Sequence, residues 1–355
     1  MKIALVAAAN SPHTVKWANI LEKKGNTISV FSFPEHKPEK LEFNPGVSIQ
    51  YLGVSIADGG VKKNAKELKS LLAAGNFDVV NAIEAHTYGF LTAQTKCGKL
   101  LLTVTGPDLY AAESEAKRPV LKAIKAAAAV CSPSAVGMQR VSALFKKEKQ
   151  VFVAPPGVDL YAFDKKDVEK EEGVCVFGCI KALEAYSDID TLIDAYCAMK
   201  LKTQAKTKLV IIGSGSLEGR LKQKCADLNL QEEIEFKGQL PHDQIPDEIN
   251  KMTALLNTSR KEIFGVSTVE AMACGVPTIA TDTEGSSEII LNGVTGYTVK
   301  IGKADAFAYR MKEFADYPQN AAKMGSKTRQ DVEELYEINA CAEKYEKALE
   351  YASKA

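Results

Sequence analysis

The sequence predicts an α/β fold built from two Rossmann-like, doubly wound domains with a cleft between them. The chain has 355 residues, which is more than one hydrophobic core comfortably supports. Nearly continuous apolar segments alternate with helix-forming ones, a pattern typical of a parallel sheet covered on both faces. A proline- and glycine-rich break at residues 155–159, followed by a charged stretch at 164–173, divides the alternation into two sets. We therefore expect an N-terminal domain over residues 1–165 and a C-terminal domain over 166–335.

The first set opens as a doubly wound domain does, with a strand at residues 2–7, a polar loop, a helix at 14–24 and a strand at 27–33. Further strands are expected at 47–52, 77–82, 100–105, 128–131 and 150–154, with helices at 62–74, 87–96, 120–127 and 135–145. Ligands bind at the carboxyl ends of the strands in such a sheet. The loop after the first strand, with Asn10, Ser11 and His13, is therefore a candidate ligand loop.

The second set has the same alternation. Its strands are expected at residues 174–180, 208–212, 233–236, 254–256, 279–281 and 297–299. Helices are expected up to residue 229, at 244–252, from 267, from 284 and from 304 to the end. The last segment, 336–355, is interpreted as a helix that could pack back on the N-terminal domain.

Composition and charge limit the function classes. Lys and Arg equal Asp and Glu at 45 each, and a zero net charge argues against general nucleic-acid binding. Residues 1–165 carry 21 basic and 14 acidic side chains. This surplus could attract an anionic ligand or make a peripheral contact with a membrane, although a surplus of this size is more often an ordinary solvated surface.

The eight cysteines stand singly, without the spacing of a zinc site, which is typical of a reducing compartment. No segment has the pattern of a signal peptide or the length of a membrane span. We therefore expect a soluble, cytoplasmic protein.

Residues 261–281 form the most informative stretch. Ser267 and Glu270 fit a capping box, and Gly275 and Pro277 stop the helix that would start near Ser267. The backbone N–H groups at a helix N-terminus favour an anion. The groups that could present such donors are those of Phe264, Gly265, Val266 and Ser267, and Gly265 would let the anion come close.

Two carboxylates, Glu262 and Glu270, stand eight positions apart across this turn. A carboxylate can accept two hydrogen bonds from a vicinal diol, such as that of a ribose or a hexose. Taken singly, Glu270 could only close the capping box and Glu262 could be a solvated loop residue. With the rest of the stretch they indicate a site for a sugar and a ribose.

A second glycine-bearing turn, Gly213, Ser214 and Gly215, follows the strand at 208–212. Glycines at a tight strand-to-helix turn are often required only because a side chain would not fit there. No third glycine stands at the spacing of a dinucleotide-binding fingerprint, so NAD binding is not expected.

Several motifs together resemble one family. The segment from Glu262 to Thr281 resembles the E-x7-E region of the retaining GT-B glycosyltransferases of the group 1 type, glycosyltransferase family 4. The segments PPGVDLYAF at 155–163, IIGSG at 211–215, NGVTGY at 292–297 and SPHTVKW at 11–17 are similar to other parts of that family's pattern. The resemblance covers nearly the whole chain and is stronger after residue 150.

The resemblance implies transfer of a hexosyl or N-acetylhexosaminyl group, with retention, from a nucleotide sugar. The acceptor would be a glycan or a lipid-linked molecule of envelope or polysaccharide synthesis, reached in the cytoplasm or at the inner face of the membrane. Glu270 would hold the ribose hydroxyls and Glu262 the transferred sugar. Lys181, Arg260 and the helix N-terminus would offset the diphosphate charge, so neither a metal nor a cofactor is expected.

The resemblance also assigns the remaining residues. The predicted catalytic residues are Glu262, Lys181 and His13. The predicted donor-binding residues are Glu270, Phe264, Gly265, Val266, Ser267, Gly213, Ser214, Gly215 and Arg260. The predicted acceptor-side residues are Asn10, Ser11, His86 and Asp108.

The chain departs from the family pattern in both halves. Cys179 and Tyr186 or Ser187 stand near the positions where the family usually has an Arg and a Lys, and Lys181 is the cation of that loop. Thr105 and Asn81 stand where relatives often carry imidazoles or an indole. The alternative function is therefore a nucleotide-sugar binding protein of the same fold with weakened or lost transfer activity. Another GT-B chemistry, such as epimerisation or phosphorolysis, ranks third.

Overall fold

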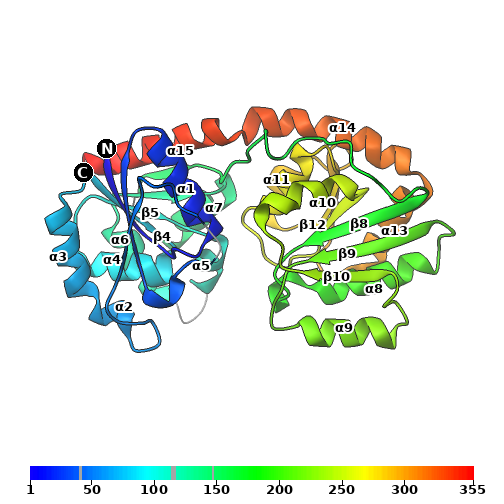
Figure 1. Cartoon of the computed structure of the whole chain (residues 1–355), viewed down its shortest axis with the longest axis horizontal. Helices are drawn as coiled ribbons and strands as arrows, with labels where there is room; N and C mark the ends of the chain where they lie inside the picture. Colours follow the sequence, from blue (N-terminus) through cyan, green and yellow to red (C-terminus); the bar gives the residue numbers. More distant parts are fainter. Residues whose placement is uncertain (40–41, 113–116, 146–147) are drawn as a thin grey trace. The chain divides into compact units, whose positions relative to one another are not determined.

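The computed structural model describes residues 1–39, 42–112, 117–145 and 148–355. They form two compact units, one of Met1–Pro156 with Asn339–Ala355 and one of Gly157–Ile338, called unit 1 and unit 2. Each unit is one parallel sheet with helices on both faces (Figure 1). The predicted fold class of two parallel Rossmann-like sheets is thus confirmed.

The described part of unit 1 contains a seven-stranded parallel sheet in the order β3-β2-β1-β4-β5-β6-β7. Its strands are β1 (Lys2–Val6), β2 (Thr27–Ser32), β3 (Ser48–Tyr51), β4 (Val79–Ile83), β5 (Leu100–Thr103), β6 (Ala129–Ser132) and β7 (Val151–Val153). Residues such as Ile3, Leu5, Val79 and Leu101 are fully buried, because both faces of the sheet are covered.

The helices of unit 1 are α1 (Pro12–Lys23), α2 (Gly60–Lys63), α3 (Ala65–Gly75), α4 (Phe90–Thr95), α5 (Gly106–Ala111), α6 (Lys117–Ala126), α7 (Ala135–Leu144) and α15 (Ile338–Ser353). A π-helical turn, Ala85–Gly89, precedes α4. Helices α1 and α15 share a core with one face of the sheet. In that core Trp17 stacks on Tyr345 with ring centroids 4.5 Å apart.

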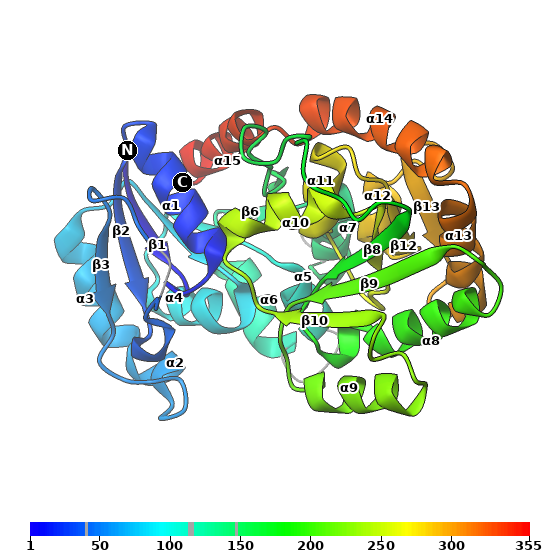
Figure 2. The same cartoon turned by 45° about the vertical axis from the view of Figure 1, so that its right-hand side comes forward.

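Unit 2 contains a six-stranded parallel sheet in its described residues, in the order β10-β9-β8-β11-β12-β13. Its strands are β8 (Val174–Ile180), β9 (Lys206–Ile212), β10 (Ile234–Gly238), β11 (Ala254–Asn257), β12 (Thr278–Thr281) and β13 (Gly296–Val299). Figure 2 shows β8, β9 and β10 side by side.

The helices of unit 2 are α8 (Ile189–Lys200), α9 (Glu218–Asp227), α10 (Ile245–Lys251), α11 (Val266–Ala273), α12 (Glu284–Ile289), α13 (Ala304–Asp316) and α14 (Pro318–Leu335). Helices α8, α9 and α13 build one hydrophobic core with the sheet. Helices α10, α11, α12 and α14 build a second core, which includes Leu255 and Ala280 of the sheet. The two cores lie on opposite faces, since successive side chains of a strand point to opposite sides.

Each sheet reverses its strand order at one place. In unit 1 the reversal lies between β1 and β4, and in unit 2 between β8 and β11. At such a switch point the two connecting loops leave in opposite directions, and ligands bind beyond the carboxyl ends of the strands there. The loops that follow β1, β4, β8 and β11 are therefore the places to look for a site.

One local expectation is wrong. The helix after Glu262 begins at Val266 with Gly265 as N-cap, and no side chain caps it, so Ser267 and Glu270 do not form a capping box. A capping box does form at Thr105 and Asp108, where it starts the unexpected helix α5.

In the described part of the chain, no helix has the length and apolarity needed to cross a membrane.

Candidate active site

A buried ion pair lies at the switch point of unit 2. Lys181 directly follows β8, and Glu262 lies in the loop after β11. Lys181 Nζ donates a hydrogen bond to Glu262 Oε1. The two side chains are 15% and 9% exposed, so the pair is shielded from most of the screening that weakens surface ion pairs.

The second carboxylate oxygen of Glu262 is also held. Asn257, the last residue of β11, donates from Nδ2 to Glu262 Oε2 at 2.6 Å. The Ser286 hydroxyl lies 3.4 Å from the same oxygen. Gly265 makes room for this carboxylate, because a Cβ there would lie 3.1 Å from Glu262 Oε2 and 2.9 Å from Thr268 Oγ1. Gly265 is therefore required by the position of the Glu262 carboxylate.

The glycine turn after β9 supports the loop that carries Lys181. Gly213 has a φ of +135°, and a Cβ there would meet the Lys181 carbonyl oxygen at 1.9 Å. A Cβ on Gly215 would lie 2.5 Å from the Leu183 carbonyl oxygen. The N–H groups of Lys181 and Leu183 donate to the Ile212 and Ser214 carbonyls at 3.0 and 2.9 Å. Both glycines are thus needed for the close approach of two loops.

Cys179 cannot replace the cation that the family pattern places near it. Its side chain is fully buried, and burial raises the pKa of its thiol to about 12. The thiol therefore stays neutral. Lys181, two residues later, is the cation that this loop brings to Glu262.

Glu270 lies on α11 and is paired with a histidine from another segment. His242 Nε2 lies 2.8 Å from Glu270 Oε1, and the His242 ring packs on Phe163 with centroids 5.3 Å apart. Glu270 is 7% exposed, whereas the His242 side chain is 56% exposed. The carboxylate is thus held by a partner that solvent or a ligand can reach.

Arg260 is the second predicted cation, and it is paired with Asp188. Arg260 Nε lies 3.0 Å from Asp188 Oδ2, and the arginine side chain is 56% exposed. Asp188 stands at the N-terminus of α8 with a φ of +50° and also accepts from the Thr191 hydroxyl at 2.8 Å. The Asp188 carboxylate therefore already offsets part of the charge that Arg260 could offer to an anion.

The remaining predicted donor residues surround these pairs. Val266 and Ser267 form the first turn of α11, whose leading N–H groups have no intrahelical acceptor. Phe264 packs edge to face on Tyr336 with centroids 5.6 Å apart. Ser214 lies between the two close-packed glycines and 3.4 Å from Gln239.

In unit 1, His86 lies between two carboxylates beyond the ends of β4 and β5. His86 Nδ1 lies 3.1 Å from Asp108 Oδ1 and is also paired with Glu84. The hydrogen bond to Asp108, followed by that to Glu84, raises the pKa of His86 to about 10. His86 is therefore an imidazolium at neutral pH and has no free nitrogen lone pair for use as a general base.

The two carboxylates differ in their surroundings. Asp108 is fully buried and accepts from the Thr105 N–H and hydroxyl at 2.8 and 2.9 Å. Burial opposes ionisation of Asp108, but the hydrogen bond from His86, followed by those with Glu84 and the Thr105 N–H, lowers its pKa overall, whereas burial raises the pKa of Glu84. Ligand atoms of the three groups lie within 4.8 Å of one another and could also hold a metal ion. Metal independence therefore stays a prediction.

The loop after β1, with Asn10 and Ser11, and the first turn of α1, with His13, lie at the same end of this sheet. Ser11 is the N-cap of α1, and Asn10 and His13 are exposed. Asn81, which stands where relatives often carry a histidine, is fully buried. Its amide donates to the Tyr345 hydroxyl of α15, so its role is to hold that helix.

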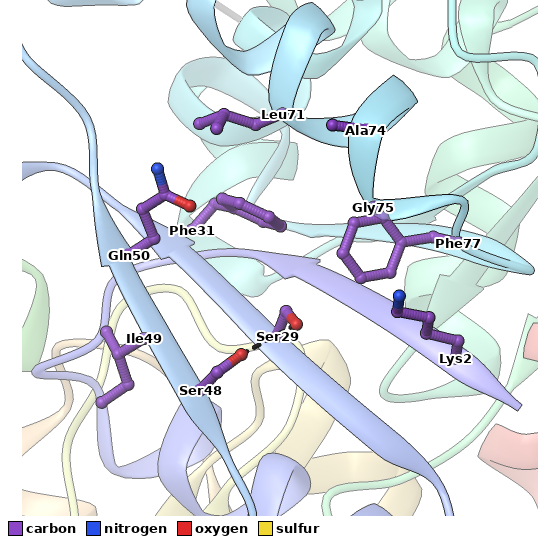
Figure 3. A pocket seen from close by; sticks show the side chains of 10 residues that line it. All are labelled: Lys2, Ser29, Phe31, Ser48, Ile49, Gln50, Leu71, Ala74, Gly75 and Phe77. Carbon is purple, nitrogen blue, oxygen red and sulfur yellow. Dashed lines mark hydrogen bonds between the residues drawn. The ribbon is translucent and has the colours of Figure 1, made fainter.

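A hollow in the described part of unit 1 lies away from these charged groups. It has a volume of about 400 Å³ and is lined by Lys2 and Ser48, which begin β1 and β3, and by residues near the end of α3. Figure 3 shows the rings of Phe31 and Phe77 in this hollow. We place the candidate site by its charged side chains, because this hollow holds no cluster of chemical groups.

Several residues beside the predicted ones carry no motif. His242, Asn257 and Ser286 hold the two glutamates, and Glu84 holds His86. The position of Asn257 at the end of β11 was a usable signal, since polar residues at strand ends often face a site. The partners of Glu270 and His86 depend on tertiary packing.

Two family models match the chain. The model described as glycosyl transferases group 1 matches residues 161–331, and the model described as glycosyl transferase 4-like matches residues 2–134. The chain is 26% identical over 210 residues to N-acetyl-alpha-D-glucosaminyl L-malate synthase from Bacillus anthracis. This match covers 57% of the chain and 54% of that protein, and the chain spans about half or less of the curated relatives it matches.

Solved structures resemble the chain over its whole length. Sucrose-phosphate synthase from Thermosynechococcus elongatus has a TM-score of 0.84 at 18% identity, covering 98% of each chain. HepE from Anabaena, solved with UDP, has a TM-score of 0.78 at 17% identity, covering 99% of this chain and 100% of that one. At these identities the likeness shows the fold, which is GT-B.

Proposed function

The chain belongs to the group 1 glycosyltransferases, glycosyltransferase family 4, a retaining family with the GT-B fold. On this premise we propose that it transfers a hexosyl or N-acetylhexosaminyl group from a nucleotide-sugar donor to a glycan or lipid-linked acceptor. The observation that carries this proposal is the buried Lys181–Glu262 pair at the switch point of unit 2, where this fold binds ligands.

The proposed donor site uses both glutamates. Glu262, fixed by Asn257 and Lys181, contacts hydroxyls of the transferred sugar, and Glu270 accepts from the ribose hydroxyls. The diphosphate lies against the first turn of α11, with Lys181 held by Glu262 and with Arg260 in the loop that precedes this helix. Gly213 and Gly215 keep the adjoining turn narrow beside the nucleoside.

Retention follows from where the leaving group sits. The helix N-terminus and Lys181 stabilise the negative charge that develops on the leaving diphosphate as its bond to the sugar breaks. Its oxygen, on the face that the acceptor approaches, takes the proton of the attacking hydroxyl. Because His86 is already protonated, it does not compete for this role, and His13 remains the proposed imidazole on the acceptor side.

The UDP in the HepE complex makes UDP the first nucleotide to test. A thermal-shift panel of UDP, GDP, ADP, TDP and CDP finds the base, since a nucleotide at 100 times its Kd stabilises by about 2.7 kcal/mol. We expect one nucleotide to raise the Tm. If none does, the donor site is wrong.

A turnover assay then separates transfer from binding. Release of that nucleotide from its sugar conjugate is measured with a crude lipid and glycan extract, with and without EDTA. We expect the nucleotide to be released, at a rate that EDTA does not change. A loss in EDTA would contradict metal independence and point to the Glu84, His86 and Asp108 group.

A second candidate function is binding of a nucleotide sugar without transfer. It is favoured by the state of the two cations, because Lys181 is engaged by Glu262 and Arg260 by Asp188. Each of these carboxylates already offsets charge that a diphosphate would otherwise meet. A nucleotide-sugar conjugate that raises the Tm and stays intact over many hours would support this alternative.

We further propose that unit 1 contacts an anionic membrane through α6. Lys117, Arg118, Lys122 and Lys125 are exposed on this helix, while Val120 and Ile124 are buried. Each basic residue near an anionic surface contributes about 1 kcal/mol. Sedimentation with phosphatidylglycerol vesicles, but not phosphatidylcholine vesicles, is expected and should weaken in K122Q/K125Q. Equal sedimentation of the variant would exclude α6.

A further inference from the structure

A line of four hydrogen-bonded residues runs across the carboxyl end of the sheet in unit 1. The Ala9 N–H donates to Ser32 Oγ at 3.0 Å, and Ser32 Oγ lies 3.2 Å from the Tyr88 hydroxyl. The Tyr88 hydroxyl lies 2.5 Å from His36 Nδ1. Ser32 ends β2, Ala9 follows β1, and Tyr88 lies in the π-helical turn after β4. The line therefore crosses the switch point of this sheet.

The direction of each hydrogen bond follows from counting donors and acceptors. Ser32 is fully buried and its oxygen accepts from Ala9, so its own hydrogen needs an acceptor. Among the described residues, that acceptor is the Tyr88 oxygen. The Tyr88 oxygen also accepts from the Phe33 N–H at 3.3 Å. The phenol hydrogen is then left for His36 Nδ1, which must accept.

An Nδ1 that accepts places the hydrogen of a neutral imidazole on Nε2. The opposite assignment, with Nδ1–H donating to Tyr88, turns the phenol hydrogen toward Ser32 and leaves the buried serine hydrogen without an acceptor. The charged form of His36 would also leave the Ser32 hydrogen without an acceptor, because its Nδ1 also carries a hydrogen. Burial lowers the pKa of His36, and the nearby Glu35 opposes this. Both considerations favour the neutral ring.

His36 Nε2 has no hydrogen-bond partner among residues 1–39, 42–112, 117–145 and 148–355, and the residue is partly exposed. We propose that His36 is a binding residue for the acceptor substrate, whose oxygen it holds through Nε2–H. This rests on the proposed function. The same line of hydrogen bonds is anchored at Ala9, the neighbour of Asn10, so it couples His36 to the predicted acceptor loop.

His36 and His86 then have different tasks at one sheet edge. His86 is a charged group whose Nδ1 is occupied by two carboxylates. His36 is a neutral donor aligned by Tyr88. A donor N–H cannot remove the proton of the attacking hydroxyl, so His36 acts on the binding of the acceptor and not on the proton transfer. The structure thereby adds an acceptor residue that carries no sequence motif.

The tautomer can be measured directly because the chain has four histidines. Long-range proton–nitrogen NMR spectra distinguish the two neutral tautomers, and single variants assign each ring. We expect the His36 ring to be the Nε2–H tautomer at pH 7.5. In Y88F, which lacks the Tyr88 hydroxyl, we expect the Nδ1–H tautomer of His36 to be populated as well. An Nδ1–H tautomer in the wild type would overturn the proposal. This result does not depend on nucleotide binding, so the donor site and the His36 proposal can fail separately.

Two matched variants test the binding role. In H36N the amide oxygen replaces Nδ1 and keeps the bond from Tyr88, but the distal donor is lost. In H36Q the amide nitrogen reaches the place of Nε2. With methyl α-D-glucopyranoside and L-malate as acceptor probes, we expect H36N to raise the probe KM about tenfold, with donor KM and kcat nearly unchanged, and H36Q to recover most of the loss.

The reciprocal control is H242Q, which should raise the donor KM and leave the probe KM alone. Equal probe KM values for H36N and wild type would overturn the proposal. So would equal losses in H36N and H36Q, since a structural role would not distinguish the two amides. The two probes should also shift the NMR signal of His36 Nε2 when each is added at 100 times its KM. If neither probe shifts this signal, the proposal that His36 binds the acceptor is wrong.

Discussion

The two sheets reverse their strand order in the same way, but the groups at the two switch points are not the same. In unit 2 the switch point holds a buried ion pair, Lys181 and Glu262, with neutral donors on the remaining carboxylate oxygen. In unit 1 it holds the charged group of Glu84, His86 and Asp108, together with a line of neutral hydrogen bonds that ends at His36. A buried charge must be fully paired, whereas a neutral donor tolerates exposure. This suits a fixed donor site and an adaptable acceptor site.

The largest effect should come from the carboxylate of the ion pair. Glu262→Gln keeps the shape of the side chain but removes the charge that Lys181 neutralises. We expect kcat/KM for the nucleotide sugar to fall by about 10² to 10³, the range for one lost electrostatic contact to a transition state. Glu232→Gln, at an exposed position, is the control. Activity within twofold of wild type would remove Glu262 from the reaction.

Lys181→Met tests the same pair through stability. It leaves Glu262 buried without its cation, and breaking a buried pair costs about 3 kcal/mol or more. We expect urea unfolding of unit 2 to shift accordingly and the double variant with Glu262→Gln to recover much of the loss. Additive losses in the double-variant cycle would mean that the two charges do not stabilise each other.

The matching stability test in unit 1 is Tyr345→Phe. It removes the hydroxyl that accepts from the buried Asn81 amide, and one such hydrogen bond contributes about 1 kcal/mol. Tyr351→Phe on the same helix is the control, since its ring is 47% exposed. We expect a lower Tm for Tyr345→Phe only, with donor KM unchanged. A changed donor KM would show that α15 does more than complete unit 1.

The smallest effect concerns the charge on His86. Its folded pKa is raised from 6.5 to about 10, so its contribution to stability is complete below pH 6.5 and is lost as the pH rises toward 10. Wild type should therefore be more stable than His86→Gln at pH 6, and the difference should shrink by pH 10. Because His86 is 43% exposed, solvent screening keeps the effect small. A constant difference would contradict the ion cluster.

The sequence predicts the fold well because the strands are continuous apolar runs and the glycine-bearing turns separate them. Strand β8 (Val174–Ile180) has the expected bounds, and Gly213 has the steric role that its turn suggested. Helix α8 was not anticipated, although its residues alternate apolar and polar at helical spacing.

Local motifs are less reliable, and two similar patterns show why. Thr105 and Asp108 form a capping box, whereas Ser267 and Glu270, at the same spacing, do not. Glu270 instead pairs with His242, which lies 28 residues earlier in the chain. The spacing alone permits both outcomes, and the packing of α11 against its neighbours decides. For the same reason, the His36 line, assembled from three separate segments, left no signal in the sequence.

The central claim is that unit 2 holds a nucleotide sugar by Glu262 and Glu270. Isothermal titration of wild type, Glu270→Ala and Glu232→Ala with the nucleoside diphosphate found in the thermal-shift panel tests it most directly. We expect Glu270→Ala to weaken binding tenfold or more, about 1.4 kcal/mol, and Glu232→Ala to bind as wild type does. Equal Kd values for wild type and Glu270→Ala would contradict the account.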